Sequence, residues 1–109
     1  MRNWSGKRVT IMGLGRFGGG VGIAAALARR GAELLVTDTA DPATLAESVD
    51  ELTSQSPRGS IEFHFGEHRA EHFTSAELVI ASPAVPTPWR NEFLLAAKEA
   101  GVDITTEIE

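Results

Sequence analysis

Cysteine is absent from the 109 residues of this sequence. That absence excludes disulfide frameworks, Cys-ligated zinc and thiol nucleophiles, and it is typical of proteins in a reducing cytoplasm. Long apolar runs are missing too, since the longest one, Ile23–Ala28, is far shorter than the ~18 residues that a membrane span needs. Met1–Arg8 lacks the apolar region and the cleavage site of a signal peptide. We therefore expect a cytoplasmic protein that does not associate with membranes.

Positive charge is scarce as well. Ten Lys and Arg residues stand against fifteen Asp and Glu residues, which gives a formal net charge of −5 and a pI near 5.2. This balance argues against a non-specific nucleic-acid binder and against a polybasic membrane binder. It leaves room for a local anion site, because the N-terminus of a helix can bind phosphate even on an acidic protein. The length suits one domain, residues 1–109, and is too short for two.

Short apolar strands alternate along the chain with helical or turn segments. The predicted strands are Arg8–Met12, Glu33–Thr37, Ile61–Phe65, Glu77–Ala81 and Val102–Thr105. Helical crossovers between such strands require parallel pairing and right-handed connections. The predicted fold class is therefore α/β, a Rossmann-like doubly wound parallel sheet of five strands in the order 3-2-1-4-5 with helices on both faces.

Capping residues and apolar periodicity set the limits of the predicted helices. They span about 18–30, 42–53 and 88–100, and a turn with about one helical turn spans 66–73. Asp41 is the predicted N-cap of the second helix, with Pro42 at its first position, and Ser54–Ser60 is the loop after it. Thr87 and Pro88 take the same two roles in the last helix. Its predicted apolar face comprises Trp89, Phe93, Ala96 or Ala97, and Ala100.

The segment Gly13–Gly18 carries a G-x-G-x-x-G motif between a predicted strand and a predicted helix. Gly13 permits a tight turn, Gly15 lets the backbone approach a diphosphate, and Gly18 lets the helix pack close to the strand. Free N–H groups at the helix start and the helix dipole would then bind the anion. The alternative is that these glycines only allow close packing. Arg16 either meets the phosphate or is an ordinary solvated arginine.

Asp38 ends the second predicted strand, close to the spacing of the acid that binds ribose in dinucleotide-binding folds. Its carboxylate could accept from a ribose hydroxyl or a base N–H, and the alternative is a capping or turn aspartate. The glycine motif and Asp38 together predict a nucleotide with a diphosphate, without identifying which one. Four loops leave the carboxyl ends of the strands and should surround it: Gly13–Gly20, Asp38–Asp41, Gly66–His72 and Ser82–Pro88.

Other candidate sites are weaker. His64, His68 and His72 recur every four residues, but a strand ends between them, so we favour polar residues at the rim of the site over a metal site. The sequence holds no G-x-x-x-x-G-K-[ST] loop and no G-x-S-x-G elbow, and no acid–base constellation can be assembled from it. We therefore expect this chain to contain no catalytic residue, metal site or cofactor of its own.

Four stretches, residues 6–15, 36–39, 77–86 and 101–109, together resemble the N-terminal domain of the Mur ligases, in particular the members that add D-glutamate. The resemblance implies a three-domain ligase of peptidoglycan precursor synthesis. Its first domain holds the UDP part of UDP-N-acetylmuramoyl-L-alanine, the second binds ATP and Mg²⁺, and the third receives D-glutamate. The resemblance places the ATP loop, the magnesium ligands and the reactive groups beyond Glu109, so this chain alone is expected to be inactive.

The same resemblance assigns roles to individual residues. The backbone of Gly15–Gly18 would hold the UDP diphosphate, Asp38 and Thr39 would meet the uridine, and Gly66 would contact the nucleotide. Phe17 stands where the family often has Ser or Thr, so a hydroxyl contact to the diphosphate is lost, and Arg16 could supply a charge-assisted one instead. Two other functions remain compatible with the glycine motif and Asp38: a regulatory NAD-binding module, and the cofactor half of a dehydrogenase.

Overall fold

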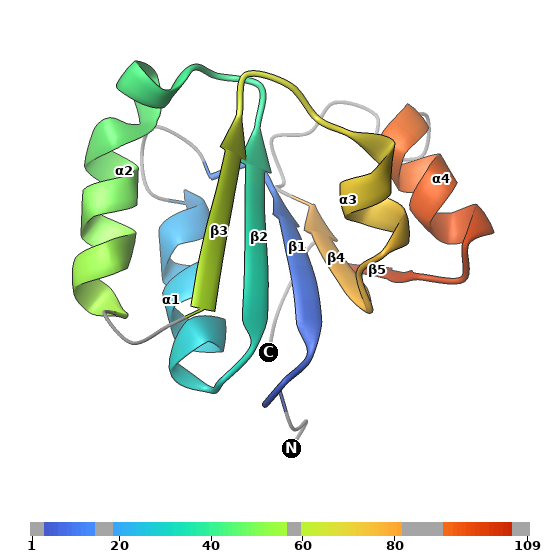
Figure 1. Ribbon diagram of the computed structural model, residues 1–109, viewed down its shortest axis with the longest axis horizontal. Helices are drawn as coiled ribbons and strands as arrows, with labels where there is room; N and C mark the ends of the chain where they lie inside the picture. The colour runs from blue at the N-terminus through green and yellow to red at the C-terminus, as the bar shows by residue number, and fades with distance from the viewer. Residues whose placement is uncertain (1–3, 15–18, 57–59, 82–90, 106–109) are drawn as a thin grey trace.

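The computed structural model describes residues 4–14, 19–56, 60–81 and 91–105. Within these ranges it contains one parallel sheet of five strands in the order β3-β2-β1-β4-β5, which confirms the predicted order (Figure 1). The strands are β1 (Arg8–Met12), β2 (Glu33–Asp38), β3 (Ser60–Phe65), β4 (Leu78–Ala81) and β5 (Asp103–Thr105). The helices are α1 (Gly19–Arg29), α2 (Pro42–Gln55), α3 (Ala70–Thr74) and α4 (Glu92–Glu99).

One face of the sheet is covered by α1 and α2, and a large apolar cluster lies between these helices and the strands. Alternation along each strand sends every second side chain to this face, as expected for a pleated strand. Ala-rich α1 lies close to the strands because its inward positions carry small side chains, among them Ala24 and Ala25, which are fully buried. The cluster also includes Val9 and Ile11 from β1, Leu34 and Val36 from β2, and Leu45 and Leu52 from α2.

The other face is covered by α3 and α4 and is apolar only over part of its width (Figure 1). Phe73 of α3 is fully buried and stacks on Phe93 of α4, with ring centroids 5.3 Å apart. Over β1 and β2 the same face carries two buried threonines, Thr10 and Thr37. The Thr10 hydroxyl donates to the carbonyl oxygen of His72 at 2.6 Å. This bond anchors the short helix α3 to the middle of the sheet.

Most predicted boundaries agree with the structure to within one or two residues. Asp41 caps α2 as predicted, because its carboxylate accepts from the Thr44 N–H at 2.8 Å. Gly13, Gly31 and Gly101 have positive φ angles of 98°, 89° and 82°, as their predicted positions at turns and helix ends require. The predicted loop over Ser54–Ser60 is too long, since α2 continues to Gln55 and β3 already begins at Ser60.

The predicted start of the last helix is wrong. Helix α4 begins at Glu92 and is capped by Asn91, whose side-chain oxygen accepts from the N–H groups of Phe93 and Leu94 at 2.9 and 3.2 Å. The Asn91 side chain thus satisfies two of the N–H groups that have no partner within the helix, which makes Asn91 a favourable start. Thr87, Pro88 and Trp89 lie outside the described residues. The predicted apolar face also shifts, because Leu94 and Ala97 are buried whereas Ala100 is exposed.

Two adjacent leucines of α4 provide a matched test of this packing. Leu94 is 3% exposed against the α3 face of the sheet, whereas Leu95 is 44% exposed. We expect Leu94→Ala to lower the free energy of unfolding by about 2–5 kcal/mol because it leaves a cavity. Leu95→Ala should change it by less than about 0.5 kcal/mol. Urea denaturation of both variants checks this, and equal losses would contradict the assigned helix face.

Candidate functional site at the carboxyl edge of the sheet

The carboxyl ends of β1, β2 and β3 lie at one edge of the sheet, at the top of Figure 1. The backbone that leaves β1 turns sharply at Gly13, whose φ of 98° is easily reached only without a side chain. The Gly13 N–H donates to the Thr37 carbonyl of β2 at 2.8 Å. The next residue, Leu14, is fully buried in the α1/α2 cluster. This turn fixes the direction in which the chain enters the glycine motif.

Asp38 lies at the end of β2 and bonds to backbone on both sides of itself. One carboxylate oxygen, Oδ2, accepts from the Leu14 N–H at 2.9 Å, and the other, Oδ1, accepts from the Ala40 N–H at 3.0 Å. The turn aspartate that the sequence left as an alternative is therefore present. A carboxylate has about four acceptor positions, so these two bonds do not preclude a contact to a ligand. Thr39, between Asp38 and Ala40, is exposed at the same edge.

Gly66 follows β3 and closes against the same turn. Its N–H donates to the carbonyl oxygens of Asp38 and Ala40, at 2.9 and 3.0 Å. Its φ is 98°, and a Cβ built at this position would meet no heavy atom within 4 Å. The glycine is therefore required by the backbone angle and leaves open space beside it. The structure thus brings three of the predicted site residues, Asp38, Thr39 and Gly66, to one edge.

The remaining predicted site residues lie outside the described ranges. These are Gly15, Arg16, Phe17 and Gly18, and the same holds for the proline-rich loop Ser82–Pro88. Helix α1 is described from Gly19 onward, and its first turn contains no acidic residue. The positive end of the α1 dipole is therefore not offset by a carboxylate of its own first turn. The contacts of Gly15, Arg16, Phe17 and Gly18 with a nucleotide remain predictions.

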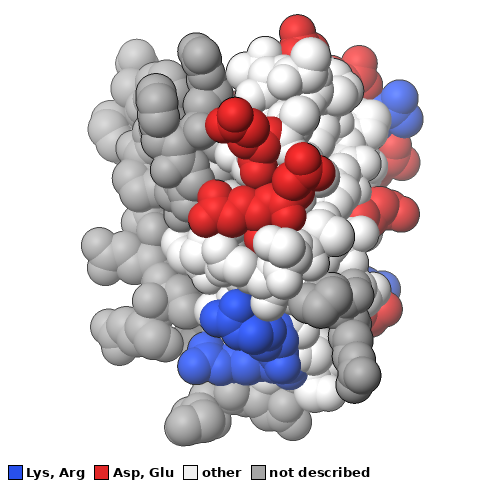
Figure 2. All heavy atoms as spheres, turned by 90° about the vertical axis from the view of Figure 1, so that its left-hand side faces the viewer, with Lys and Arg blue, Asp and Glu red and all other residues white. Residues whose placement is uncertain are grey.

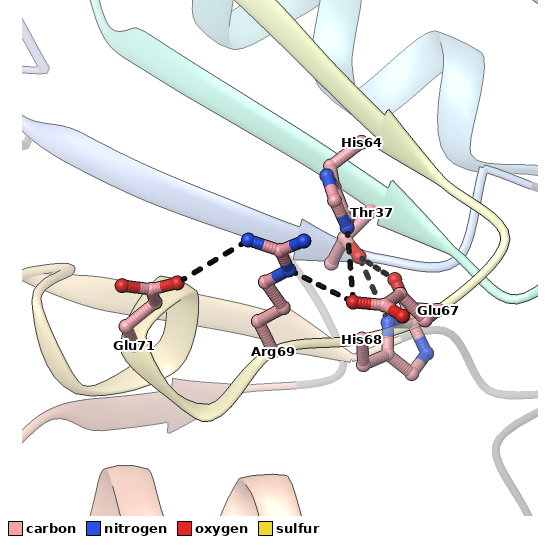
Figure 3. A network of polar contacts seen from close by, with 6 residues as sticks. All are labelled: Thr37, His64, Glu67, His68, Arg69 and Glu71. Atoms are coloured by element: carbon pink, nitrogen blue, oxygen red, sulfur yellow. Dashed lines mark hydrogen bonds and ion pairs between the residues drawn. The ribbon is translucent and has the colours of Figure 1, made fainter.

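The β3–α3 connection carries a polar network beside the site (Figure 3). The Thr37 hydroxyl lies 2.9 Å from Nδ1 of His68. Glu67 Oε2 accepts from Arg69 Nε at 2.8 Å and lies 3.8 Å from His64 Nε2. These contacts cross from β2 and β3 to the connection, so they hold it over the end of the sheet. Thr37 is the residue that sequence reasoning missed, since a threonine inside an apolar strand is an ordinary strand residue.

Each of the three histidines packs against another aromatic ring. His64 and His72 pack edge to face with ring centroids 4.9 Å apart, while His68 packs edge to face against Phe73 and Phe93. In the described part of the chain, no three His, Asp or Glu residues are placed to hold a metal ion. Burial is the main cause that lowers the pKa of His68, and the neighbouring His64 and His72 lower it further while Asp38 opposes them. Burial also lowers the pKa of His72.

Charged side chains also gather away from the carboxyl edge. Exposed acidic side chains gather on the side of α2 shown in Figure 2, where this helix carries Glu47, Asp50 and Glu51. A cavity of about 290 Å³ lies over the α3 face near the amino ends of the strands, with Arg8, Glu33 and Ser60 in its lining. It is separate from the carboxyl edge. No helix within the described ranges is long and apolar enough to cross a membrane.

The sheet order and the loops at its carboxyl edge define a Rossmann-like α/β domain. Solved structures agree on the fold. A quinate dehydrogenase from Corynebacterium glutamicum in complex with NAD aligns over 94% of this chain and 44% of its own, with a TM-score of 0.61 and 21% identity. A short-chain dehydrogenase/reductase variant from Serratia marcescens aligns over 91% of this chain and 51% of its own, with a TM-score of 0.62 and 16% identity. At such identities the likeness shows the fold alone.

Sequence comparison identifies the family. The family model described as "Mur ligase MurD-like, N-terminal domain" matches residues 7–106, so the chain belongs to this family. It is 42% identical over 104 residues to a UDP-N-acetylmuramoylalanine–D-glutamate ligase from Roseiflexus sp. (strain RS-1), and 45% identical over 103 residues to one from Treponema pallidum (strain Nichols). These alignments cover 95% and 94% of this chain, but it spans only 21% and 19% of the two relatives. The resemblance inferred from the sequence is therefore confirmed.

The half-buried histidines His68 and His72 predict a specific loss of stability in acid. A histidine whose pKa is lower in the folded state binds its proton more readily when unfolded, so stability rises with pH through the affected range. We expect the free energy of unfolding to fall as the pH drops from about 7 to about 5. His68→Asn and His72→Gln should flatten this slope, with the double variant flattest. Urea midpoints between pH 8 and pH 5 measure it, and a slope unchanged in the double variant would assign the effect to other groups.

Proposed function

We propose that this chain is the UDP-binding part of a ligase that joins D-glutamate to UDP-N-acetylmuramoyl-L-alanine in peptidoglycan precursor synthesis. The match to the family over residues 7–106 carries the proposal. Because the chain spans about a fifth of its curated relatives, the activity belongs to a longer protein. The parts of that protein beyond this chain supply ATP and Mg²⁺ binding, the D-glutamate site and the reactive groups. The place of action is the cytoplasm, where nucleotide-linked precursors are made.

The proposed binding mode relies on backbone groups at the carboxyl edge. The N–H groups of Gly15–Gly18, which precede α1 in the sequence, bind the UDP diphosphate, helped by the helix dipole. Phe17 contributes only its backbone N–H, and Arg16 adds a charge-assisted contact to a phosphate oxygen. The uridine lies toward β2 and β3, where Asp38, Thr39 and Gly66 meet it. The open space beside Gly66 and the exposure of Thr39 support this placement.

In this arrangement the chain binds and orients but performs no bond-making step. The polar groups described at the edge are engaged with one another: Asp38 with two backbone amides, Glu67 with Arg69, and His68 with Thr37. Such groups hold loops in place and are poor candidates for proton transfer to a substrate. The chain therefore contributes affinity for the UDP part of the substrate. The reacting carboxyl group is directed away from the sheet.

A ligand titration of the isotope-labelled chain tests the proposal. UDP-N-acetylmuramoyl-L-alanine, UDP and NAD⁺ are added separately while amide chemical shifts are followed. We expect both uridine ligands to shift the signals of Leu14, Asp38, Thr39 and Gly66, and NAD⁺ to leave them in place. A preference for NAD⁺ would favour the regulatory-module alternative. Absence of shifts with all three ligands would contradict nucleotide binding by this chain on its own.

Two exposed threonines provide a matched pair for the uridine contact. Thr39 lies at the carboxyl edge, whereas Thr53 is exposed near the far end of α2. Thr39→Val removes a hydroxyl at nearly constant shape, so we expect it to weaken UDP binding by about 2- to 10-fold, the usual worth of one hydrogen bond. Thr53→Val should leave the affinity unchanged. Isothermal titration or shift-derived dissociation constants measure both, and equal affinities for the two variants would remove Thr39 from the site.

A further inference from the structure

The carboxylate of Asp38 connects two loops that are far apart in the sequence. Its Oδ2 accepts from Leu14 N–H, 24 positions earlier, and its Oδ1 accepts from Ala40 N–H in its own turn. Leu14 is buried and is the second residue of the glycine motif, so its position constrains the beginning of that motif. The carboxylate therefore acts on the chain segment proposed to hold the diphosphate, at a distance from the phosphates themselves.

The backbone of Asp38 extends the same connection to a third segment. Its carbonyl oxygen accepts from Gly66 N–H at 2.9 Å. One residue thus touches the turn after β1, the turn after β2 and the turn after β3. Hydrogen bonds from N–H groups to an ionised carboxylate are stronger than those to a neutral acceptor, by roughly a factor of two. A neutral side chain at this position would hold the turns less firmly.

We propose that Asp38 is a positioning residue of the nucleotide site, whose carboxylate clamps the β1–α1 turn to the β2–α2 turn. This inference rests on the proposed function, because the site it positions is the UDP site. It adds to the expected uridine contact a role that operates before any ligand arrives. The clamp sets the spacing between the diphosphate-binding amides and the uridine end of the site.

The effect of removing the Asp38 charge on UDP affinity distinguishes a positioning role of this residue from a purely electrostatic one. Asp38 places a negative charge near a site for an anion, which by itself opposes binding. Removing that charge should therefore tighten UDP binding if nothing else changes. The clamp predicts the opposite, because the amide that replaces the carboxylate in Asp38→Asn has one acceptor oxygen and one donor nitrogen. At most one of the two N–H groups then keeps its acceptor.

Asp41→Asn is the matched control. Asp41 lies three positions further along the chain, and its carboxylate accepts from Thr44 N–H at 2.8 Å within its own helix start. The substitution removes the same charge from the same loop, and asparagine is as good an N-cap as aspartate. Any difference between the two variants therefore reports the bridge to Leu14, since the change in charge is common to both.

The experiment measures amide hydrogen exchange in the free chain and then UDP affinity. For Asp38→Asn we expect exchange at Leu14 or Ala40 to speed up by about tenfold or more relative to the core amides of Ile11 and Val36. We also expect UDP binding to weaken by about tenfold. Asp41→Asn should leave exchange at Leu14 and Ala40 unchanged, and it should leave UDP binding equal or slightly tighter because only the charge is removed. If Asp38→Asn does not fold, Asp38→Glu keeps the charge but displaces the carboxylate, and the same two readouts apply.

Three outcomes decide between the roles. Faster exchange at the bridged amides together with weaker UDP binding supports the clamp. Weaker binding with unchanged exchange overturns it and leaves Asp38 as a direct ligand contact only. Unchanged or tighter binding overturns it as well. If the unsubstituted chain binds no UDP, the proposed function fails and with it the role in nucleotide binding, while the exchange data still show whether the carboxylate holds the two turns.

Discussion

Parallel alignment of β1, β2 and β3 is the constraint on which the rest of the structure depends. Met12 pairs with Thr37, and Asp38 pairs with Phe65, so the three strands end nearly level. Backbone groups just beyond the ends have no strand partner, and unpaired groups there are costly wherever water is excluded. They bond instead to one another and to the Asp38 carboxylate. The backbone around the proposed site is thus held by hydrogen bonds that continue the bonding of the sheet beyond the ends of its strands.

The two faces of the sheet contribute differently to stability and to the site. The α1/α2 face is covered by a large apolar cluster. The opposite face combines an apolar part around Phe73 with polar side chains on β1, β2 and β3, and His68 of the β3–α3 connection contacts both Phe73 and Thr37. His68, whose pKa is lowered by burial, bonds to Thr37, and Thr37 stands next to Asp38 in the chain. A titratable side chain therefore adjoins the proposed nucleotide site.

Similarity to dehydrogenases and membership of the Mur ligase family are compatible, because the first concerns the fold and the second concerns the sequence. Layers of helices on a parallel sheet place a crevice at the strand ends whatever the ligand, and the glycine turn suits any diphosphate. The fold alone would not distinguish UDP from NAD. Under the proposed function, the choice of nucleotide depends on a few groups at the uridine end, such as Thr39 and the space beside Gly66, and these contacts are predictions.

The order of the strands, the cap at Asp41 and the turns at Gly13, Gly31 and Gly101 follow from the sequence, because apolar periodicity, capping side chains and positive φ angles are local properties. The prediction failed at the start of α4, where Asn91 competes with Thr87 and Pro88 and local preference alone does not decide between them. The tertiary structure alone decided that Asp38 bridges to Leu14, that Thr37 meets His68, and that Leu94 is buried while Leu95 is exposed. These contacts join residues distant in the chain, and only the packed sheet brings them within hydrogen-bond or van der Waals distance.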